Sequence, residues 1–256
     1  MTVRQALLAA AALAIALWVA LALGRGGKSD LSGLARAVQR GEELVPHIEA
    51  GRRRDEAKRA LAAEVVAGRM TLREAAERFR RLDPPDLVYP TGLPRPPRDE
   101  RFFCGQVLDF GCVVLVQQGR FAAAARWCAA VFTAHPHVLA GPPADHRYYA
   151  ARAAAWAGCG QGRDAADLDA EGRAGFRRQA LDWLRADLEA RRRLLEQERE
   201  NAGGPVADDL RQWLGNFPFA GVRGPDALAR LPEPERQAWR QLWEEIEALR
   251  QRAAEP

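Results

Sequence analysis

The chain contains an uninterrupted apolar run from Ala6 to Leu23, which follows Arg4 and ends before Gly24 and Arg25. A helix rises about 1.5 Å per residue, so this run would make a helix about 27 Å long. That length is close to the roughly 30 Å hydrocarbon core of a bilayer. The run therefore predicts a transmembrane anchor over residues 1–24 and a single-pass membrane protein.

More basic residues follow the run than precede it, among them Arg25 and Lys28, against Arg4 alone. This bias favours a cytoplasmic body. Large domains can be translocated whatever their charge, and Ala20-Leu21-Ala22 matches a signal-peptidase site, so a periplasmic or secreted form stays an alternative. The run exceeds the usual signal-peptide core of about 7 to 15 residues, which favours an uncleaved anchor.

Composition after the run favours helix over strand, because Ala, Leu, Arg and Glu dominate and Val, Ile and Thr are scarce. The fold class predicted is all-α. The cysteines lack C-x-x-C spacing and lie among apolar residues, so we expect small buried hydrophobic side chains rather than disulfides or metal ligands. They are Cys104, Cys112, Cys128 and Cys159.

Residues 25–82 form a basic juxtamembrane segment that is predicted to be helical. Arg52, Arg53 and Arg54 are expected to lie on a solvated helix face or, alternatively, to contact anionic lipid head groups. Nucleic acid is not expected as a partner, because the basic residues alternate with Glu and lack nearby aromatic side chains. A helix-turn-helix interpretation of residues 50–82 is the weaker alternative to two packed amphipathic helices.

Local signals mark the helix ends in this segment. Gly41 and Pro46 are expected to interrupt a first helix, and Gly68 is expected to end the next one. The sequence Thr71-Leu72-Arg73-Glu74 is a capping box, which predicts a helix to about Leu82. The side chains expected to face inward are those of Leu72, Ala75, Ala76 and Phe79.

A proline-rich stretch over residues 83–99 excludes regular helix and predicts a stiff linker before a helical domain at residues 100–252. In that domain, helices are predicted over residues 101–118 and 121–134, with a turn at Gly119 and a stop at His135-Pro136. A second pair is predicted over residues 145–159 and 171–200. Gly203-Gly204-Pro205 is expected to break the chain before further helices, the last of which carries Trp239 and Trp243.

The first helix pair resembles a divergent tetratricopeptide repeat, in which large and small residues alternate so that two helices nest. Aromatic positions of the first helix are Leu here, and Cys128 stands where a Phe is usual. The pattern positions are Leu108, Gly111, Cys112, Leu115, Ala124, Cys128 and Pro136.

Residues 101–252 also resemble the tetratricopeptide-type C-terminal region of planctomycete serine/threonine kinases. The resemblance is carried by the stretch Gln179-Ala180-Leu181-Asp182-Trp183-Leu184-Arg185-Ala186-Asp187-Leu188, and by Leu231-Pro232-Glu233 followed by Trp239 and Trp243. The kinase domain itself is missing. The resemblance therefore implies a repeat module rather than phosphoryl transfer.

Two sets of side chains are candidates for binding a partner. Asp187 and Arg191 fall inside the apolar stripe of their helix and are four residues apart, so we expect a partly buried salt bridge or, alternatively, a docking hot spot. Trp239 and Trp243 share one face of the last helix and are expected to cap the repeat stack or to form a docking surface.

The chain shows no catalytic constellation, and we predict that it is not an enzyme and needs no cofactor or metal. The phosphate-loop lookalike at Gly24-Arg25-Gly26-Gly27-Lys28-Ser29 follows an apolar run rather than a buried strand. Asp109-Phe110-Gly111 lacks the other kinase motifs, and the two serines are confined to residues 29–32. His135, His137 and His146 are expected to be exposed in turns rather than to bind a metal.

These observations predict a membrane-tethered helical-repeat protein that binds another protein through a concave helical surface. The alternative is a regulatory or orphaned module of a bacterial serine/threonine kinase system.

Overall fold

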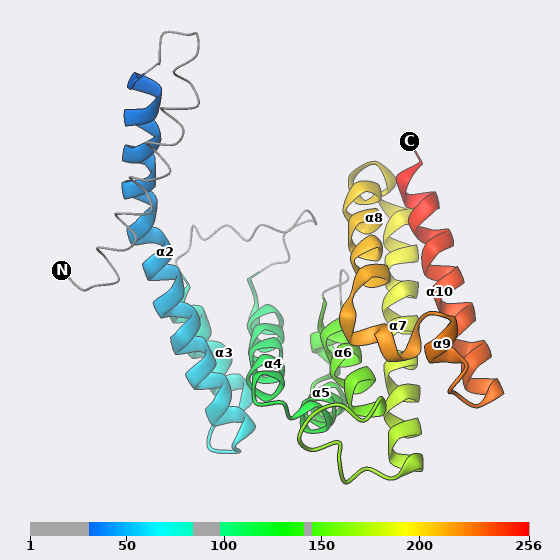
Figure 1. Ribbon diagram of the computed structural model, residues 1–256. Helices are drawn as coiled ribbons and strands as arrows, with labels where there is room; N and C mark the ends of the chain where they lie inside the picture. Colours follow the sequence, from blue (N-terminus) through cyan, green and yellow to red (C-terminus); the bar gives the residue numbers. More distant parts are fainter. Residues whose placement is uncertain (1–30, 84–97, 141–144, 256) are drawn as a thin grey trace. The chain divides into compact units, whose positions relative to one another are not determined.

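The computed structural model describes residues 31–83, 98–140 and 145–255, and every regular element in these ranges is a helix (Figure 1). The predicted all-α class is confirmed. The chain divides into two compact units, Met1–Arg53 and Arg54–Pro256. The helices are α2 (Leu31–Val66), α3 (Leu72–Leu82), α4 (Glu100–Gln117), α5 (Phe121–Ala134), η1 (Pro136–Leu139), α6 (His146–Gly158), α7 (Ala170–Gln197), α8 (Arg199–Gly215), η2 (Phe217–Val222), α9 (Pro225–Leu228) and α10 (Glu233–Ala254).

The prediction of a single-pass membrane protein is corrected by the helices that the structure describes. None of those between Leu31 and Glu255 is long and apolar enough to cross a bilayer. The longest of them, α2 and α7, are rich in charged residues, whose burial in hydrocarbon is costly. The run from Ala6 to Leu23, on which that prediction rested, lies outside the described residues, as does the phosphate-loop lookalike.

Helices α2 and α3 meet at a turn whose local signals act as predicted. Helix α2 ends at Val66, and Gly68 takes a left-handed conformation with φ +72°. The Thr71 hydroxyl accepts a hydrogen bond from the Glu74 backbone N–H at 3.2 Å, and the Glu74 carboxylate accepts one from the Thr71 backbone N–H at 2.9 Å. This capping box is confirmed, and so is the predicted buried face of α3.

The predicted interruption of α2 at Gly41 and Pro46 is wrong, because α2 continues through both residues. A proline removes one helical hydrogen bond, but strong helix formers on both sides allow the helix to continue. Arg52 and Arg53 are exposed on α2, whereas Arg54 lies 3.6 Å from the Asp83 carboxylate. Lipid contact by these arginines stays a prediction.

A buried lysine connects α2 with the end of α3 and with α4. The Lys58 ammonium lies 2.7 Å from an Asp83 carboxylate oxygen and donates a hydrogen bond to the Gln106 side-chain carbonyl at 2.8 Å. Burial lowers the pKa of Lys58, and the nearby Asp83 carboxylate opposes this effect. Residues on both sides of the predicted 83–99 linker therefore belong to one compact unit, Arg54–Pro256.

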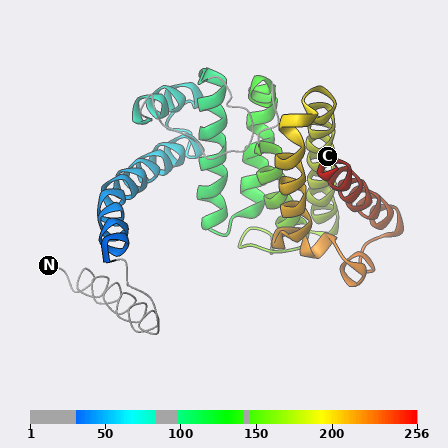
Figure 2. The ribbon, with the colours of Figure 1, turned by 90° about the horizontal axis from the view of Figure 1, so that it is seen from above.

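Within that unit, helices adjacent in sequence also pack against each other (Figure 2). Helix α3 contacts α4, and the contacts continue in order through α5, α6, α7 and α8. Helix α10 returns to pack on both α8 and α7. The turn between α4 and α5 uses Gly119 with φ +70°, as the sequence predicted.

The predicted break at Gly203-Gly204-Pro205 is wrong, because α8 runs through it. The residues around the break are largely buried against α10, which compensates for the poor helix propensity of glycine and proline. A Cβ at Gly203 would lie 2.9 Å from the Ala253 carbonyl oxygen, so only glycine permits this close approach of the two helices.

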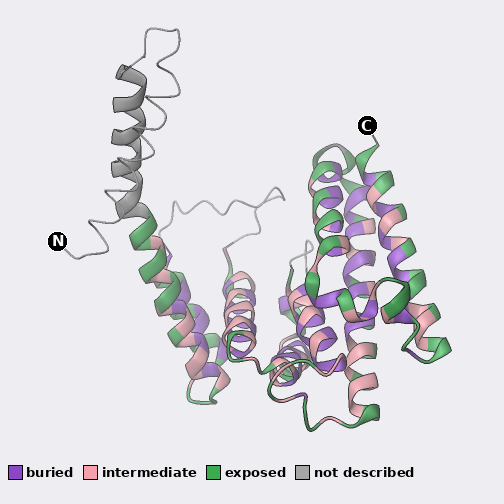
Figure 3. Cartoon of the chain, viewed as in Figure 1, coloured by how far each residue is buried: buried purple, intermediate pink, exposed green. Residues whose placement is uncertain are grey.

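Helices α7, α8 and α10 all contribute buried residues to the one hydrophobic core (Figure 3). Helix α10 has its apolar residues on one face, as the helical spacing predicted. These buried residues are Trp239, Leu242, Trp243, Ile246, Leu249 and Ala253. The opposite face of α10 is left for solvent or for a ligand.

Candidate functional site

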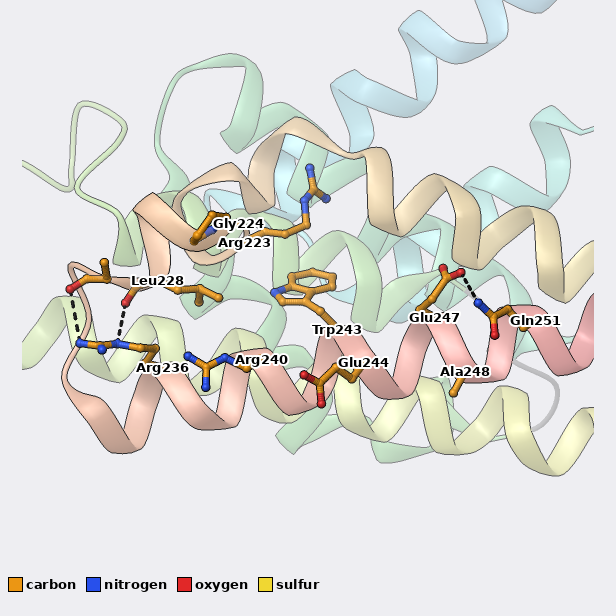
Figure 4. Close-up of a pocket in the computed structure, with 12 residues that line it drawn as sticks. Arg223, Gly224, Leu228, Arg236, Arg240, Trp243, Glu244, Glu247, Ala248 and Gln251 are labelled. Atoms are coloured by element: carbon orange, nitrogen blue, oxygen red, sulfur yellow. Dashed lines mark hydrogen bonds between the residues drawn. The ribbon is translucent and has the colours of Figure 1, made fainter.

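An open groove of about 740 Å³ lies between α10 and the segment that connects it to α8 (Figure 4). The second wall is built by the end of η2 and by α9. Leu228 of α9 and Trp243 of α10 line the groove, although both are largely buried, at 7% and 8% exposed. The other lining residues are Arg223, Gly224, Pro225, Ala229, Arg236, Arg240, Glu244, Glu247, Ala248 and Gln251.

Two arginines hold the wall in place through backbone carbonyls. Arg236 of α10 donates hydrogen bonds to the carbonyl oxygens of Leu228 and Leu231, at 3.2 and 3.1 Å. The Leu228 carbonyl ends the short helix α9 and the Leu231 carbonyl lies between α9 and α10, so the arginine ties this connection to α10. Arg223 donates to the Trp213 carbonyl at 3.0 Å and thereby ties η2 to α8.

The floor of the groove is fixed by stacked indoles. Trp243 donates from its indole N–H to the Val222 carbonyl at 2.8 Å, and its ring stacks on Trp239 with centroids 5.8 Å apart. The Arg223 guanidinium lies 5.7 Å from the Trp243 ring centroid, within the range of a cation–π contact. The apolar floor therefore has a defined position before any ligand arrives.

Two opposite charges on the rim have no internal partner. Arg240 and Glu244 are exposed, and no hydrogen bond or ion pair joins either side chain to another described residue. Glu247 differs, because Arg250 and Gln251 donate hydrogen bonds to its carboxylate and lower its pKa to about 2. Arg240 and Glu244 are thus the charges that remain free to meet a ligand.

Asp187 and Arg191, which the sequence singled out, lie in the interior rather than in the groove. Arg191 has one guanidinium nitrogen 2.8 Å from an Asp187 oxygen, and the other donates to Asp145 at 2.9 Å and to Asp209 at 3.1 Å. The guanidinium also lies 4.6 Å from the Trp213 ring centroid. Arg191 therefore links α7 to the start of α6 and to α8.

Burial shifts the pKa values of two carboxyls in this cluster, whereas the carboxylates decide the shift of Arg191. Burial raises the pKa of Asp187 to about 6, although the positive charge of Arg191 acts in the opposite direction. Burial likewise raises the pKa of Asp209. For Arg191, burial is outweighed by the carboxylates of Asp187, Asp145 and Asp209, which raise its pKa.

The partner-binding role predicted for Asp187, Arg191, Trp239 and Trp243 does not suit their positions. The first three are at most 1% exposed, and Trp243 is 8% exposed. Side chains buried to this extent stabilise the fold and offer little surface to a partner. The structural alternatives, a buried salt bridge and a packed cap, agree with the observed burial. Only Trp243 reaches the groove.

The contact between His146 and Asp109 was not predicted from the sequence. The His146 ring was expected in an exposed turn, yet its Nδ1 lies 2.8 Å from an Asp109 oxygen and its side chain is 12% exposed. Burial acts to lower the pKa of His146, but the carboxylates of Asp109, Asp145 and Asp187 together outweigh it and raise the pKa. Gly105 leaves room for this ring beside α4, and that glycine was the available signal.

The residues that resemble catalytic or metal-binding motifs in the sequence have structural positions in the fold. Asp109-Phe110-Gly111 lies within α4, where Asp109 pairs with His146. Cys104, Cys112 and Cys128 are buried and Cys159 is partly buried, and all four are free. Burial raises the pKa of the Cys104 thiol to about 11, which disfavours the reactive thiolate.

No family model matches the chain, and neither a curated protein nor a solved structure matches it. The tetratricopeptide and kinase-region resemblances therefore stay predictions.

Proposed function

We propose that this protein is a divergent helical-repeat module that binds another protein, and that the groove between α9 and α10 receives a short peptide segment of that partner. The observation that carries the proposal is a preformed groove in which exposed apolar residues, among them Ala229 and Ala248, are bordered by two exposed, unpaired charges. Binding surfaces need this combination of an apolar centre and a polar rim rather than a catalytic constellation.

The repeat character is supported by the order of helix packing. Helices α4 and α5 form a pair around Gly119, and α6 with α7 and then α8 with α10 continue the stack. Six of the pattern positions of the first pair are buried, as nested helices require: Leu108, Gly111, Cys112, Leu115, Ala124 and Cys128. The longer connections after α6 and α8 make the later pairs irregular, and the second of these connections builds a wall of the groove.

The size of the groove favours a peptide over a whole domain. Its volume of about 740 Å³ falls within the roughly 300–1,000 Å³ of sites that enclose drug-sized ligands. A few residues of extended chain match that volume. A large flat protein surface would instead need many more contacts outside the groove.

Selection from a random library of displayed heptapeptides, with the full chain immobilised, tests this proposal. Ala248 is exposed in the groove, so Ala248→Arg should fill the groove without disturbing the core and reduce binding of the selected peptides at least tenfold. Gln241→Arg adds the same charge to α10 outside the groove and should leave binding unchanged. Selected peptides that bind both variants equally would place the binding surface elsewhere.

A further inference from the structure

The charges that line the groove change sign half-way along α10 (Figure 4). Arg236 and Arg240 come first, and Glu244 and Glu247 follow toward the C-terminus. Arg236 donates to a carbonyl of α9, and Glu247 accepts from Arg250. Arg240 and Glu244 are exposed, and neither pairs with another described residue. These two charges therefore lie one turn apart on the surface of α10, with the positive one first.

Small apolar residues lie on both sides of this change of sign. Ala248 is exposed on α10, one turn after Glu244. Ala229, just after α9, is exposed as well, and its carbonyl accepts a hydrogen bond from Arg236 at 3.4 Å. Ala229 therefore lies beside the positive half of the groove, and Ala248 lies in the negative half. Both side chains are small enough to allow a neighbouring helix to approach closely.

A helix with this order of charges is complementary to a second copy of itself that runs in the opposite direction. In a pair with two-fold symmetry, a contact from residue i to residue j is repeated from j to i. If the axis passes α10 at the height of Leu242, half-way between Arg240 and Glu244, each charge faces its opposite in the second copy. Both helices rise about 6 Å between the two residues, so the charges match without adjustment.

The same axis also brings the small apolar residues together. It places Ala248 of each copy opposite Arg236 of the other, because the two residues are equally far from Leu242 in the chain. Since Arg236 is bonded to the Ala229 carbonyl, Ala248 then contacts Ala229 of the second copy. A parallel arrangement would instead place like charges against each other, which is repulsive. Only the antiparallel arrangement satisfies both the charges and the apolar residues.

We propose that this face of α10 binds the same face of a second copy of the chain, in an antiparallel pair joined by reciprocal contacts between Arg240 and Glu244. The pair covers the groove, so self-association and peptide binding compete for one surface. This inference goes beyond the proposed function and does not depend on it, because no peptide takes part in the contact. Its consequence is regulation, since the groove opens to a partner only when the copies separate.

The experiment measures the association of the full chain with itself. Sedimentation velocity follows a trace of fluorescently labelled chain while unlabelled chain is added, in a non-ionic detergent that prevents association through the apolar run Ala6–Leu23. We expect the wild type to form a dimer as its concentration rises. Arg240→Glu and Glu244→Arg should each weaken this dimer by at least about tenfold, because symmetry makes each reversal act twice.

The double variant Arg240→Glu/Glu244→Arg is the decisive sample, because it keeps the wild-type net charge and exchanges the two positions. An antiparallel pair of this variant again places opposite charges together, so its dimer should recover to within about threefold of the wild-type affinity. A mixture of the two single variants should also associate, since one copy is acidic and the other basic at these positions.

Arg78→Glu and Glu77→Arg are the matched controls. They make the same charge changes at exposed positions of α3 and should leave the wild-type dimer unchanged. Circular dichroism spectra check that every variant retains the helical fold.

Three outcomes would overturn the inference. They are a wild type that does not associate at concentrations up to about 1 mM, a dimer that ignores both reversals, and a double variant that stays as weak as the single ones. The last of these would exclude antiparallel contact between the two positions.

The inference and the proposed function fail separately. Library peptides that bind the wild type but not Ala248→Arg support the proposed function even if the chain does not associate with itself. A dimer that the double variant restores supports the inference even if no peptide is selected.

Discussion

Two pairs of opposite charges, each four residues apart on a long helix, have different environments in this protein. Asp187 and Arg191 on α7 lie 2.8 Å apart and are buried, whereas Arg240 and Glu244 on α10 are exposed and unpaired. The acidic residue comes first in the α7 pair, the order that suits the helix dipole, and the order is reversed on α10. That preference is small, so it does not explain the difference alone.

The neighbouring helices explain the rest of the difference between the two charge pairs. Arg191 is held by carboxylates from the start of α6 and from α8, whereas no described helix covers Arg240. In the interior, an unpaired charge is too costly to persist, so the guanidinium is surrounded by acceptors. At the rim of the groove, water solvates both charges and leaves them available. Two pairs with the same four-residue spacing therefore have different roles. The pair on α7 belongs to a buried cluster that links helices, and the pair on α10 is an exposed candidate for binding a ligand.

The largest effect is expected from breaking the buried cluster. Arg191→Ala leaves the buried Asp187 carboxylate without its partner and opens a cavity, which should lower the free energy of unfolding by about 3 to 5 kcal/mol. Urea denaturation followed by circular dichroism measures this loss. The exposed Arg192→Ala variant is the control, since its ion pair with Glu189 lies near the surface. If Arg191→Ala lowered the free energy of unfolding by less than about 1 kcal/mol, the cluster would not be a major source of stability.

The second expected effect is a pH dependence of the free energy of unfolding that arises from Asp187. Its carboxyl has a pKa of about 6 in the fold and about 3.8 in the unfolded chain, so the native state holds more protons between these values. Its contribution to stability is fully present below about pH 4 and is lost as pH rises through about 6. The difference between the two pKa values corresponds to up to about 3 kcal/mol in the free energy of unfolding.

Asp187→Asn cannot ionise, so its stability relative to wild type should increase from pH 4 to pH 7 by a similar amount. Urea titrations of both proteins across this range give the difference. The exposed residue Asp182 lies on the same helix, and Asp182→Asn should follow the wild-type profile. A constant difference between Asp187→Asn and wild type over the whole range would contradict the assignment.

A smaller effect is expected at the floor of the groove. Trp243→Phe keeps an aromatic ring but removes the hydrogen bond to the Val222 carbonyl, which should cost about 1 to 2 kcal/mol. Thermal unfolding measures this loss. Trp239→Phe is the matched comparison, because the Trp239 indole N–H is buried without a hydrogen-bond partner in the described structure. Removing that donor should therefore cost less stability. A greater loss of stability for Trp239→Phe than for Trp243→Phe would contradict this expectation.

The smallest effect belongs to the exposed pair. Arg240→Gln and Glu244→Gln should each change the free energy of unfolding by no more than about 0.5 kcal/mol, because neither charge is paired within the fold. Thermal melts of both variants at low and at physiological salt check this expectation. A loss above about 1 kcal/mol that high salt removes would show that the two side chains pair in solution.

Several parts of the fold were predictable because their signals are local. The capping box at Thr71 and Glu74, the turn at Gly119 and the buried stripe around Trp239 each involve only a few neighbouring residues. The break expected at Gly203-Gly204-Pro205 was wrong because it depended on helix propensity alone. Packing of α8 against α10 outweighed that propensity.

The groove was only partly predictable. Helical spacing placed Trp243 on the apolar face of its helix. It did not reveal the second wall, since α9 is four residues long and lies in a Pro/Gly-rich stretch. The position of that wall depends on bonds from Arg236 to carbonyls of a different element.

The sequence by itself determined where most of the helices lie and which of their faces are apolar, because caps, turns and helical periodicity act within one or two turns of chain. The tertiary structure decided which charges are neutralised. Asp145 and Arg191 are 46 residues apart in the chain, and their contact exists only because α6, α7 and α8 pack together. Burial makes pairing of charges obligatory, and no short-range pattern records which helices will bury a given side chain.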